Sequence, residues 1–416
     1  MEPLVHQGCI SDVRRLVPAR QAVRLAALGA LSCGLISPGT GSSATAAEIR
    51  VPQDASSLQR AIERAKPGDT IVLDAGIYPG GNVVPPEKHD VTIRGVDRST
   101  VVLDGGDVRK NGIVVHADGV SLLNMSAHSF LENAFYWEDA NRFRGSYLTA
   151  WNVRGYGIYV EDGRVGKLDH DYVSGAADAA YYIGECRPCG ATIEHVVAVL
   201  SAVGYSGTNS TGVVIRDSVW DRNGAGIVPN TYANEALPPE ERTAISRNTI
   251  TRSGQAAVPI RTALAGFVGN GIAIAGGNEN VVDHNRVTGS ERYGIVVLPT
   301  ARYVNFHPQA NREPGPPWRP RGNRVRDNVV RGSGSADLAL SDGSGKANCF
   351  RANMVGSTLP GGLQSSTCAG VSPVGDASVA AIVAAPVRVM FDRTMHRRRP
   401  PSWTTMPAPP TQPNMP

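Results

Sequence analysis

The sequence predicts an all-β protein in which short parallel strands wind into a repeating coil, and three observations predict this fold class. Gly-apolar-x-apolar motifs recur at a nearly constant interval along the chain. A second motif, apolar-x-x-Asn-x-apolar, lies between copies of the first. The 416 residues include 46 glycines and only 6% aromatic residues, a composition typical of many short strands joined by tight turns.

The first motif sets the period of the repeat, which is about 22 residues and therefore too short for a helical solenoid. Helical units also carry a 3.6-residue period, whereas these segments alternate every second residue. The fixed leucine positions of leucine-rich repeats are absent as well. Three strands and three turns per coil fit the period, with inward aliphatic side chains stacking on the coil below. The second positions of the motif are Ile113, Phe135, Ile158, Tyr181, Tyr205 and Ile227.

The second motif places an asparagine at one turn of successive coils. We expect this asparagine to adopt a left-handed backbone conformation, which asparagine tolerates at tight bends. We also expect the asparagines of neighbouring coils to hydrogen-bond along the axis. Two columns with one period predict a right-handed parallel β-helix. The asparagines are Asn248, Asn285, Asn328 and Asn353.

Residues 48–106 are predicted to form the N-terminal cap and first coils. Residues 56–59 fit a capping box, and a short helix should follow with an apolar face that ends before Pro67. A strand over residues 70–73 comes next. Such a cap would cover the open end of the apolar core, as a solenoid requires. The predicted helix face consists of Leu58, Ala61, Ile62 and Ala65.

Residues 1–47 are predicted to be a cleaved signal segment. Four arginines precede an apolar run over residues 25–36, and small residues lead to a cleavage site near Glu48. The apolar run is too short for a transmembrane helix. A twin-arginine signal, lipid attachment at Cys33 and an uncleaved extension are the alternatives. We therefore expect a secreted, periplasmic or cell-envelope protein.

The repeat is expected to occupy residues 107–368. Copies of the asparagine motif begin at residues 245, 282 and 325, and both steps between them exceed one coil, which predicts insertions in the later coils. The clearest protruding loops are expected at 231–242 and 303–321. Residues 369–416 form a low-complexity tail that is rich in proline toward its end. We expect this tail to be extended and largely disordered.

Removal of the signal segment would leave four cysteines. An even number of cysteines in an exported chain predicts disulfides, and the simplest connectivity is local. A redox pair or half of a metal site at the Cys-x-x-Cys sequence is the alternative interpretation. The predicted bonds join Cys186 to Cys189 and Cys349 to Cys368.

The formal net charge of +4 argues against a dedicated nucleic-acid binder, since such domains are strongly basic. No glycine-rich phosphate loop, nucleophile elbow or zinc-binding helix motif occurs in the sequence. We expect a monomer without a transmembrane segment.

The period, the asparagine column and the N-terminal cap together resemble the pectin-lyase-like superfamily of right-handed β-helix repeat proteins. The resemblance covers residues 48–368 and extends to generic bacterial repeat proteins, including periplasmic maturation proteins of the copper site of nitrous-oxide reductase. It matches no single enzyme family. It implies the fold, and it implies substrate clefts along the outer face of the strands.

Strand alternation places a column of three tyrosines on that outer face, beside a second column of polar residues. Glu138 and Glu161 should lie one coil apart, about 4.8 Å, so one of them should have a raised pKa or a cation should bridge them. We therefore predict Glu138, Glu161 and His116 as catalytic residues. The predicted substrate-binding residues are Tyr136, Tyr159, Tyr182 and Asn230. A bridging Ca²⁺, if present, would be held by Glu138, Glu161, Asp162 and Glu185.

A second candidate is the sequence Leu168-Asp169-His170-Asp171, which resembles the Asp-Pro-His-Asp motif of mannuronan epimerases but has Leu-Asp in place of Asp-Pro. Similar pairs recur at residues 194–195 and 283–284. This recurrence favours a position of the repeat over a special site.

The leading hypothesis is an exported protein that binds an acidic polysaccharide. As an enzyme it would be a polysaccharide lyase, a glycoside hydrolase or a uronate epimerase. The alternatives are a non-catalytic envelope-binding or metal-delivery module and an inert structural shaft.

Overall fold

The computed structural model describes residues 46–233, 235–300, 316–365, 373–379 and 400–416. These residues belong to one compact unit, 46–416. The predicted signal segment lies outside the described residues except for Ala46 and Ala47. Most of the predicted 303–321 loop, Cys368 and Cys33 lie outside them as well.

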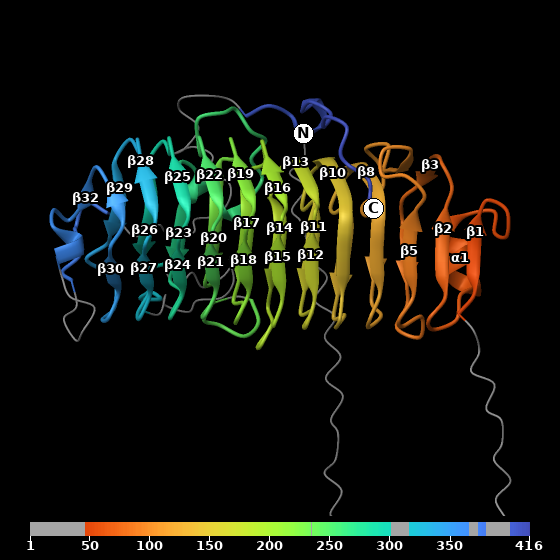
Figure 1. The fold of residues 1–416 in the computed structure, drawn as a ribbon, viewed down its shortest axis with the longest axis horizontal. Coiled ribbons are helices and arrows are strands. Elements are labelled where there is room, and N and C mark those ends of the chain that lie inside the picture. Colours follow the sequence, from red (N-terminus) through yellow and green to blue (C-terminus); the bar gives the residue numbers. More distant parts are fainter. Residues whose placement is uncertain (1–45, 234, 301–315, 366–372, 380–399) are drawn as a thin grey trace, which may run out of the picture. The chain divides into compact units, whose positions relative to one another are not determined.

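The chain folds as an all-β right-handed parallel β-helix, as the sequence predicts (Figure 1). Each complete coil contributes two strands to a larger sheet and one strand to a smaller sheet, and every named strand pair is parallel. The smaller sheet consists of β4 (Asn82–Val84), β7 (Ile113–Val115), β9 (Phe135–Glu138), β11 (Ile158–Glu161), β14 (Ala179–Gly184), β17 (Val203–Thr208), β20 (Ala225–Asn230), β23 (Ile272–Ala275), β26 (Tyr293–Leu298), β29 (Ala336–Leu340) and β32 (Thr358–Leu359).

The larger sheet bends between its two strands of each coil; in β8 and β10 a single long strand covers both positions. It consists of β1 (Glu48–Val51), β2 (Thr70–Leu73), β3 (Gly76–Pro79), β5 (Thr92–Gly95), β6 (Val101–Asp104), β8 (Ser121–Phe130), β10 (Arg144–Val153), β12 (Lys167–Asp169), β13 (Tyr172–Ala176), β15 (Thr192–Glu194), β16 (Val197–Val199), β18 (Val214–Arg216), β19 (Val219–Asp221), β21 (Ala244–Ser246), β22 (Thr249–Thr251), β24 (Val281–Asp283), β25 (Arg286–Thr288), β27 (Arg324–Arg326), β28 (Val329–Arg331), β30 (Cys349–Arg351) and β31 (Met354–Val355).

The helical elements among the described residues are α1 (Leu58–Arg64) and three short 3₁₀ helices, η1 (Ala263–Phe267), η2 (Leu363–Ser365) and η3 (Trp403–Thr405). None of the helices in the described ranges is long and apolar enough to span a membrane.

The inward positions of the glycine motif stack in the predicted register. Ile113 pairs with Phe135, Phe135 with Ile158, and the pairing continues through the next coils. All six second positions of the motif are fully buried in one continuous apolar core. The repeat period therefore equals the step from one coil to the next, which confirms the prediction from the spacing.

Helix α1 begins one residue later than the capping-box pattern predicts. Ser57 is the N-cap residue, and its hydroxyl accepts a hydrogen bond from the backbone N–H of Arg60. Gln59 does not close a capping box, because its side chain instead exchanges two hydrogen bonds with the backbone of Val83 in the adjacent coil. The predicted apolar helix face is buried, and β2 has the predicted bounds.

An asparagine ladder runs along one turn of the β-helix, as predicted. The Nδ2 of Asn248 donates to Oδ1 of Asn285 at 3.0 Å, and Asn285 donates to Asn328 in the same way at 3.0 Å. Asn328 continues the ladder to Asn353 at 2.9 Å, and Gln364 accepts the last of these bonds.

The predicted backbone conformation of these asparagines is wrong. The left-handed residue is the one before each asparagine, with φ between 53° and 56° at Arg247, His284, Asp327 and Ala352. The asparagine amide is needed inside the turn, where it bonds the ladder, whereas the preceding residue is at least partly exposed to solvent. Side-chain hydrogen bonding, and not tolerance of positive φ, therefore explains the asparagine.

A second ladder, which the sequence analysis missed, lies at another turn. The backbone N–H of Asn280 donates to Asn323, whose own N–H and Nδ2 donate to Asn348. At its start, Asn280 Nδ2 and the Thr243 hydroxyl donate to the two carboxyl oxygens of Glu240 at 2.9 and 2.7 Å. Glu240 is fully buried.

Residues 400–416 lie against β8 and β10 (Figure 1). The backbone N–H of Arg98 donates to the Asn414 side chain, and Met415 N–H donates to Asn124. The Arg98 side chain is 1% exposed and bonds Thr149, Leu148 and Pro413. The C-terminal residues therefore complete the surroundings of a buried arginine near the N-terminal coils.

Candidate functional site

The three predicted tyrosines form one column on the outer face of the smaller sheet. The ring centroids of Tyr136 and Tyr159 are 4.7 Å apart, and those of Tyr159 and Tyr182 are also 4.7 Å apart. Tyr136 and Tyr159 are half-buried, whereas Tyr182 is only 3% exposed. The parallel register of β9, β11 and β14 sets this spacing. The tyrosine column therefore has an accessible end and a covered end.

Tyr156 enlarges the column from the turn before β11. Its ring stacks on Tyr159 with centroids 4.4 Å apart and planes 8° apart, and it also contacts Tyr182 at 5.3 Å. Offset aromatic pairs of this kind contribute about 1 kcal/mol each beyond burial. The four rings make a rigid aromatic surface.

Two predicted glutamates lie beside the accessible end. Glu138 and Glu161 are partners in the β9–β11 register. The hydroxyl of Tyr136 donates to Oε2 of Glu161 at 2.5 Å, and Nδ1 of His116 lies 3.3 Å from Oε2 of Glu138. Burial, followed by the hydrogen bond to Glu161, raises the pKa of Tyr136 above its usual value, so this hydroxyl keeps its proton. The structure thus brings His116, Glu138, Glu161 and Tyr136 together.

At the covered end, the predicted loop over 231–242 adds a carboxyl group. The Tyr182 hydroxyl lies 3.4 Å from Oε2 of Glu235, and the backbone N–H of Ala236 donates to Oε2 of Glu185 at 3.0 Å. Burial, followed by the charge of Glu185, raises the pKa of Glu235 to about 8. Burial also raises the pKa of Glu185; the Ala236 hydrogen bond opposes this shift and the charge of Glu161 adds to it. Glu235 therefore holds a proton at neutral pH.

Asp178 lies beside Tyr156, and the charges of Asp178 and Arg154 both act on Arg261. Burial raises the pKa of Asp178 to about 6, against the effect of hydrogen bonds from Thr262 and Tyr156. Burial also lowers the pKa of Arg261, and the nearby charge of Arg154 lowers it further. Asp178 thus lies close to Tyr156, and Arg261 lies near both Asp178 and Arg154.

The residues predicted to hold Ca²⁺ do not form a metal site. Across the described ranges, no three His, Cys, Asp or Glu side chains are arranged to hold a metal ion. Asp162 pairs with Arg164 at 3.4 Å, and Glu185 accepts a hydrogen bond from the Ala236 backbone.

Asn230 lies at the end of β20 and is fully buried. Its Oδ1 accepts from the Thr208 hydroxyl at 3.0 Å, and its Nδ2 donates to Ser206 and to the Val228 carbonyl. Its amide is used within the sheet, so we do not include it among the residues that contact a ligand.

The Asp169-His170-Asp171 segment lies at the bend of the larger sheet. His170, His195 and His284 all occupy the left-handed position, with φ between 54° and 58°. The His170 ring stacks between Tyr147 and His195, at centroid distances of 4.7 and 5.2 Å. Asp171 fills the place of the ladder asparagine and accepts from the Leu148 N–H. The histidines therefore share a position of the repeat.

The predicted disulfide between Cys186 and Cys189 is present, with an S–S distance of 2.09 Å. Cys349 is also disulfide-bonded. Cys368, the partner predicted for it, lies outside the described residues.

Sequence reasoning missed Glu235, Asp178 and Tyr156. Glu235 is in an insertion, so no repeat register could place it beside Tyr182. Tyr156 immediately precedes Gly157, and its position one residue before a copied motif could have indicated an outward aromatic ring.

A family model described as a right-handed β-helix region matches residues 133–312, which confirms the resemblance to right-handed parallel β-helix repeat proteins. No curated protein matches the sequence. Among solved structures, the chain is similar to an alginate lyase from Paenibacillus sp. str. FPU-7, with 13% identity, a TM-score of 0.48 and coverage of 75% of this chain and 99% of that one. It is also similar to the A-module of a mannuronan C-5 epimerase from Azotobacter vinelandii (10% identity, TM-score 0.42, coverage 70% and 85%) and to a DFA-IIIase from Arthrobacter chlorophenolicus A6 without its lid (14%, 0.46, 73% and 94%).

Proposed function

We propose that this chain is an exported protein that binds an acidic polysaccharide along the tyrosine column and acts on it by acid–base chemistry. The observation that carries the proposal is the Tyr136–Glu161 hydrogen bond at the accessible end of a stacked aromatic surface. Aromatic rings offer apolar faces to sugar rings, while the carboxyl groups beside them offer hydrogen bonds to hydroxyls.

The acid–base role follows from two carboxyl groups in different surroundings. Glu161 accepts a hydrogen bond from Tyr136, while burial raises the pKa of the neighbouring Glu185. A carboxyl group whose pKa is raised by burial is suited to donate a proton. We assign Glu161 as the base and Glu185 as the acid, with Glu138 and His116 completing the polar edge.

The acidic character of the substrate requires nearby cations, since the glutamates would otherwise repel it. We assign this role to Arg154, two residues before Tyr156, and to Arg261, which lies near Asp178. Export is supported by the Cys186–Cys189 disulfide, because such bonds persist mainly in oxidising compartments.

The test is a glycan-array screen of the mature chain, followed by product assays on every polysaccharide that binds. Reducing ends report hydrolysis, unsaturated uronates report a lyase, and a changed uronate ratio without cleavage reports an epimerase. Glu161→Gln should abolish product formation, whereas Glu291→Gln, an exposed control away from the column, should not.

If the chain binds a polysaccharide but forms no product, it is a carbohydrate-binding module and the acid–base assignment is wrong. A chain that binds no polysaccharide on the array, or whose binding is unchanged in Tyr159→Ala, would contradict the proposal as a whole.

A further inference from the structure

On the outer face of the larger sheet, opposite charges pair from coil to coil. Several acidic side chains on this face or at its bend form ion pairs with basic side chains of a neighbouring coil. These pairs are Lys167–Glu194 at 2.7 Å, Arg216–Glu194 at 2.7 Å, Arg247–Asp217 at 2.8 Å and Arg326–Asp283 at 2.9 Å.

This pairing of opposite charges ends at β27 and β30, where arginines are in excess. Arg326 and Arg351 are register partners, and Arg324 lies two residues before Arg326. Arg326 is paired with Asp283 and, at 3.5 Å, with Asp327. Arg324 and Arg351 are exposed, and neither makes an ion pair with any residue that the structure describes. Within that part of the chain, two guanidinium groups therefore lack a carboxylate.

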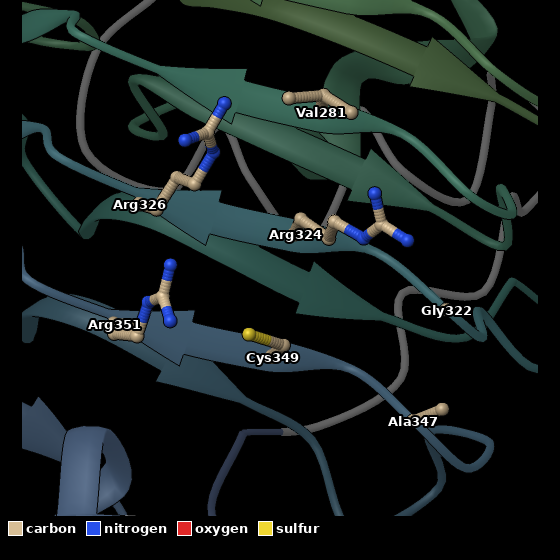
Figure 2. Close-up of a pocket in the computed structure, with 7 residues that line it drawn as sticks. All are labelled: Val281, Gly322, Arg324, Arg326, Ala347, Cys349 and Arg351. Atoms are coloured by element: carbon tan, nitrogen blue, oxygen red, sulfur yellow. The ribbon is translucent and has the colours of Figure 1, made fainter. Parts of the chain in front are cut away.

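The excess arginines line a cavity of about 500 Å³. Figure 2 shows Arg324 and Arg326 on one strand and Arg351 on the next, with its guanidinium extending toward the first strand. Small and apolar residues from neighbouring strands and turns also line the cavity. The other lining residues are Val281, Gly322, Ala347 and Cys349.

We propose that this arginine cavity binds an anionic group of an acidic polysaccharide, either a uronate carboxylate or a sulfate ester. The planar guanidinium presents paired N–H donors that match the oxygens of both groups. Arg324 and Arg351 donate to the anion, while Val281 and Ala347 contact the apolar face of the sugar. The cavity lies on the larger sheet and the tyrosine column on the smaller one, so this site is separate from the proposed reaction site.

The test compares Arg324→Gln/Arg351→Gln with Arg331→Gln, a control that removes one exposed charge from β28 outside the cavity. Calorimetric titration of the full chain with polygalacturonate, heparin and neutral dextran measures the affinities. Two exposed charge contacts, each contributing somewhat under 1 kcal/mol, predict roughly tenfold weaker binding of the anionic polymer. Arg331→Gln should stay within about twofold of wild type, since one isolated exposed charge contributes little.

If the double variant loses affinity for polygalacturonate, the carboxylate is the ligand group. If it loses affinity for heparin, the sulfate ester is the ligand group. Equal affinities of the double variant and the control for both polymers would overturn the proposal. A parallel loss of affinity for dextran would also overturn it. Thermal unfolding of each variant checks the fold, and activity at the tyrosine column, which does not contain these arginines, should be unchanged.

Discussion

The Tyr136 hydroxyl reaches across one coil to Oε2 of Glu161, which ties the aromatic column to the carboxyl groups beside it. Tyr136→Phe should therefore lower the free energy of unfolding by about 1 kcal/mol, because Glu161 loses a donor in a half-buried setting. Urea unfolding measures this change. Tyr172→Phe, which alters a half-buried tyrosine on β13, is the matched control and should have a smaller effect. Equal losses would mean that the hydrogen bond does not stabilise the fold.

The asparagine ladder predicts that Asn285→Ala strongly lowers the free energy of unfolding. This side chain accepts from both the backbone N–H and Nδ2 of Asn248, and it donates to Asn328 and to the Ile245 carbonyl. Its removal leaves several buried polar groups without partners, at about 1–3 kcal/mol each, so we expect a loss of roughly 4 kcal/mol. Arg286→Ala, on the exposed neighbouring residue, should change denaturant stability by less than about 0.5 kcal/mol.

Glu240 should make stability depend on pH. Burial raises its pKa from 4.5 to about 8 in the folded chain. Between these pH values Glu240 is protonated in the folded state but has released its proton in the unfolded state. The contribution of Glu240 to the free energy of unfolding is therefore fully present below about pH 4.5 and is lost as the pH rises to about 8. Glu240→Gln keeps a neutral side chain in the ladder and should flatten this decline, by on the order of 4 kcal/mol at pH 8.

Chemical denaturation at a series of pH values measures the effect. Glu279→Gln, at an exposed glutamate, is the control and should follow the wild-type profile. If Glu240→Gln and wild type decline in parallel, Glu240 is not the group that titrates.

The C-terminal residues should protect β8 and β10. Asn414 bonds the Arg98 backbone N–H and the Asp97 carboxylate, each at 2.6 Å. Asn414→Ala should therefore speed amide hydrogen exchange in β8 and β10, as loosening of the segment exposes Arg98. Gln412→Ala is the control, because that side chain bonds only to Pro410 in the same segment. Unchanged exchange in Asn414→Ala would show that these bonds do not hold the segment.

Repetition explains what the sequence could predict. The inward and outward columns follow from alternation and a constant period, so stacking of Tyr136, Tyr159 and Tyr182 could be predicted without coordinates. Positions outside the repeat could not be placed. Glu235 lies in an insertion, and Asn414 meets Arg98 from the opposite end of the sequence.

The error at the asparagines has a different cause. Asparagine is common both at left-handed positions and at positions that need an amide, and propensity alone cannot separate the two. The preceding residues, among them Arg247 and His284, show no shared chemistry that would have revealed the left-handed position. The residue before each asparagine adopts the left-handed conformation because the asparagine amide must point into the turn to form the ladder.

The asparagine ladder keeps the spacing of the coils independent of the number of residues in each coil. Asn248 and Asn285 are 37 residues apart and Asn285 and Asn328 are 43 apart, yet both pairs bond at 3.0 Å. The length of an insertion at the other turns therefore does not change the hydrogen bonds between asparagines at this turn. Segments at the other turns can therefore be lengthened or exchanged while the scaffold beneath them keeps its pitch, so new specificity can be acquired without rebuilding the core.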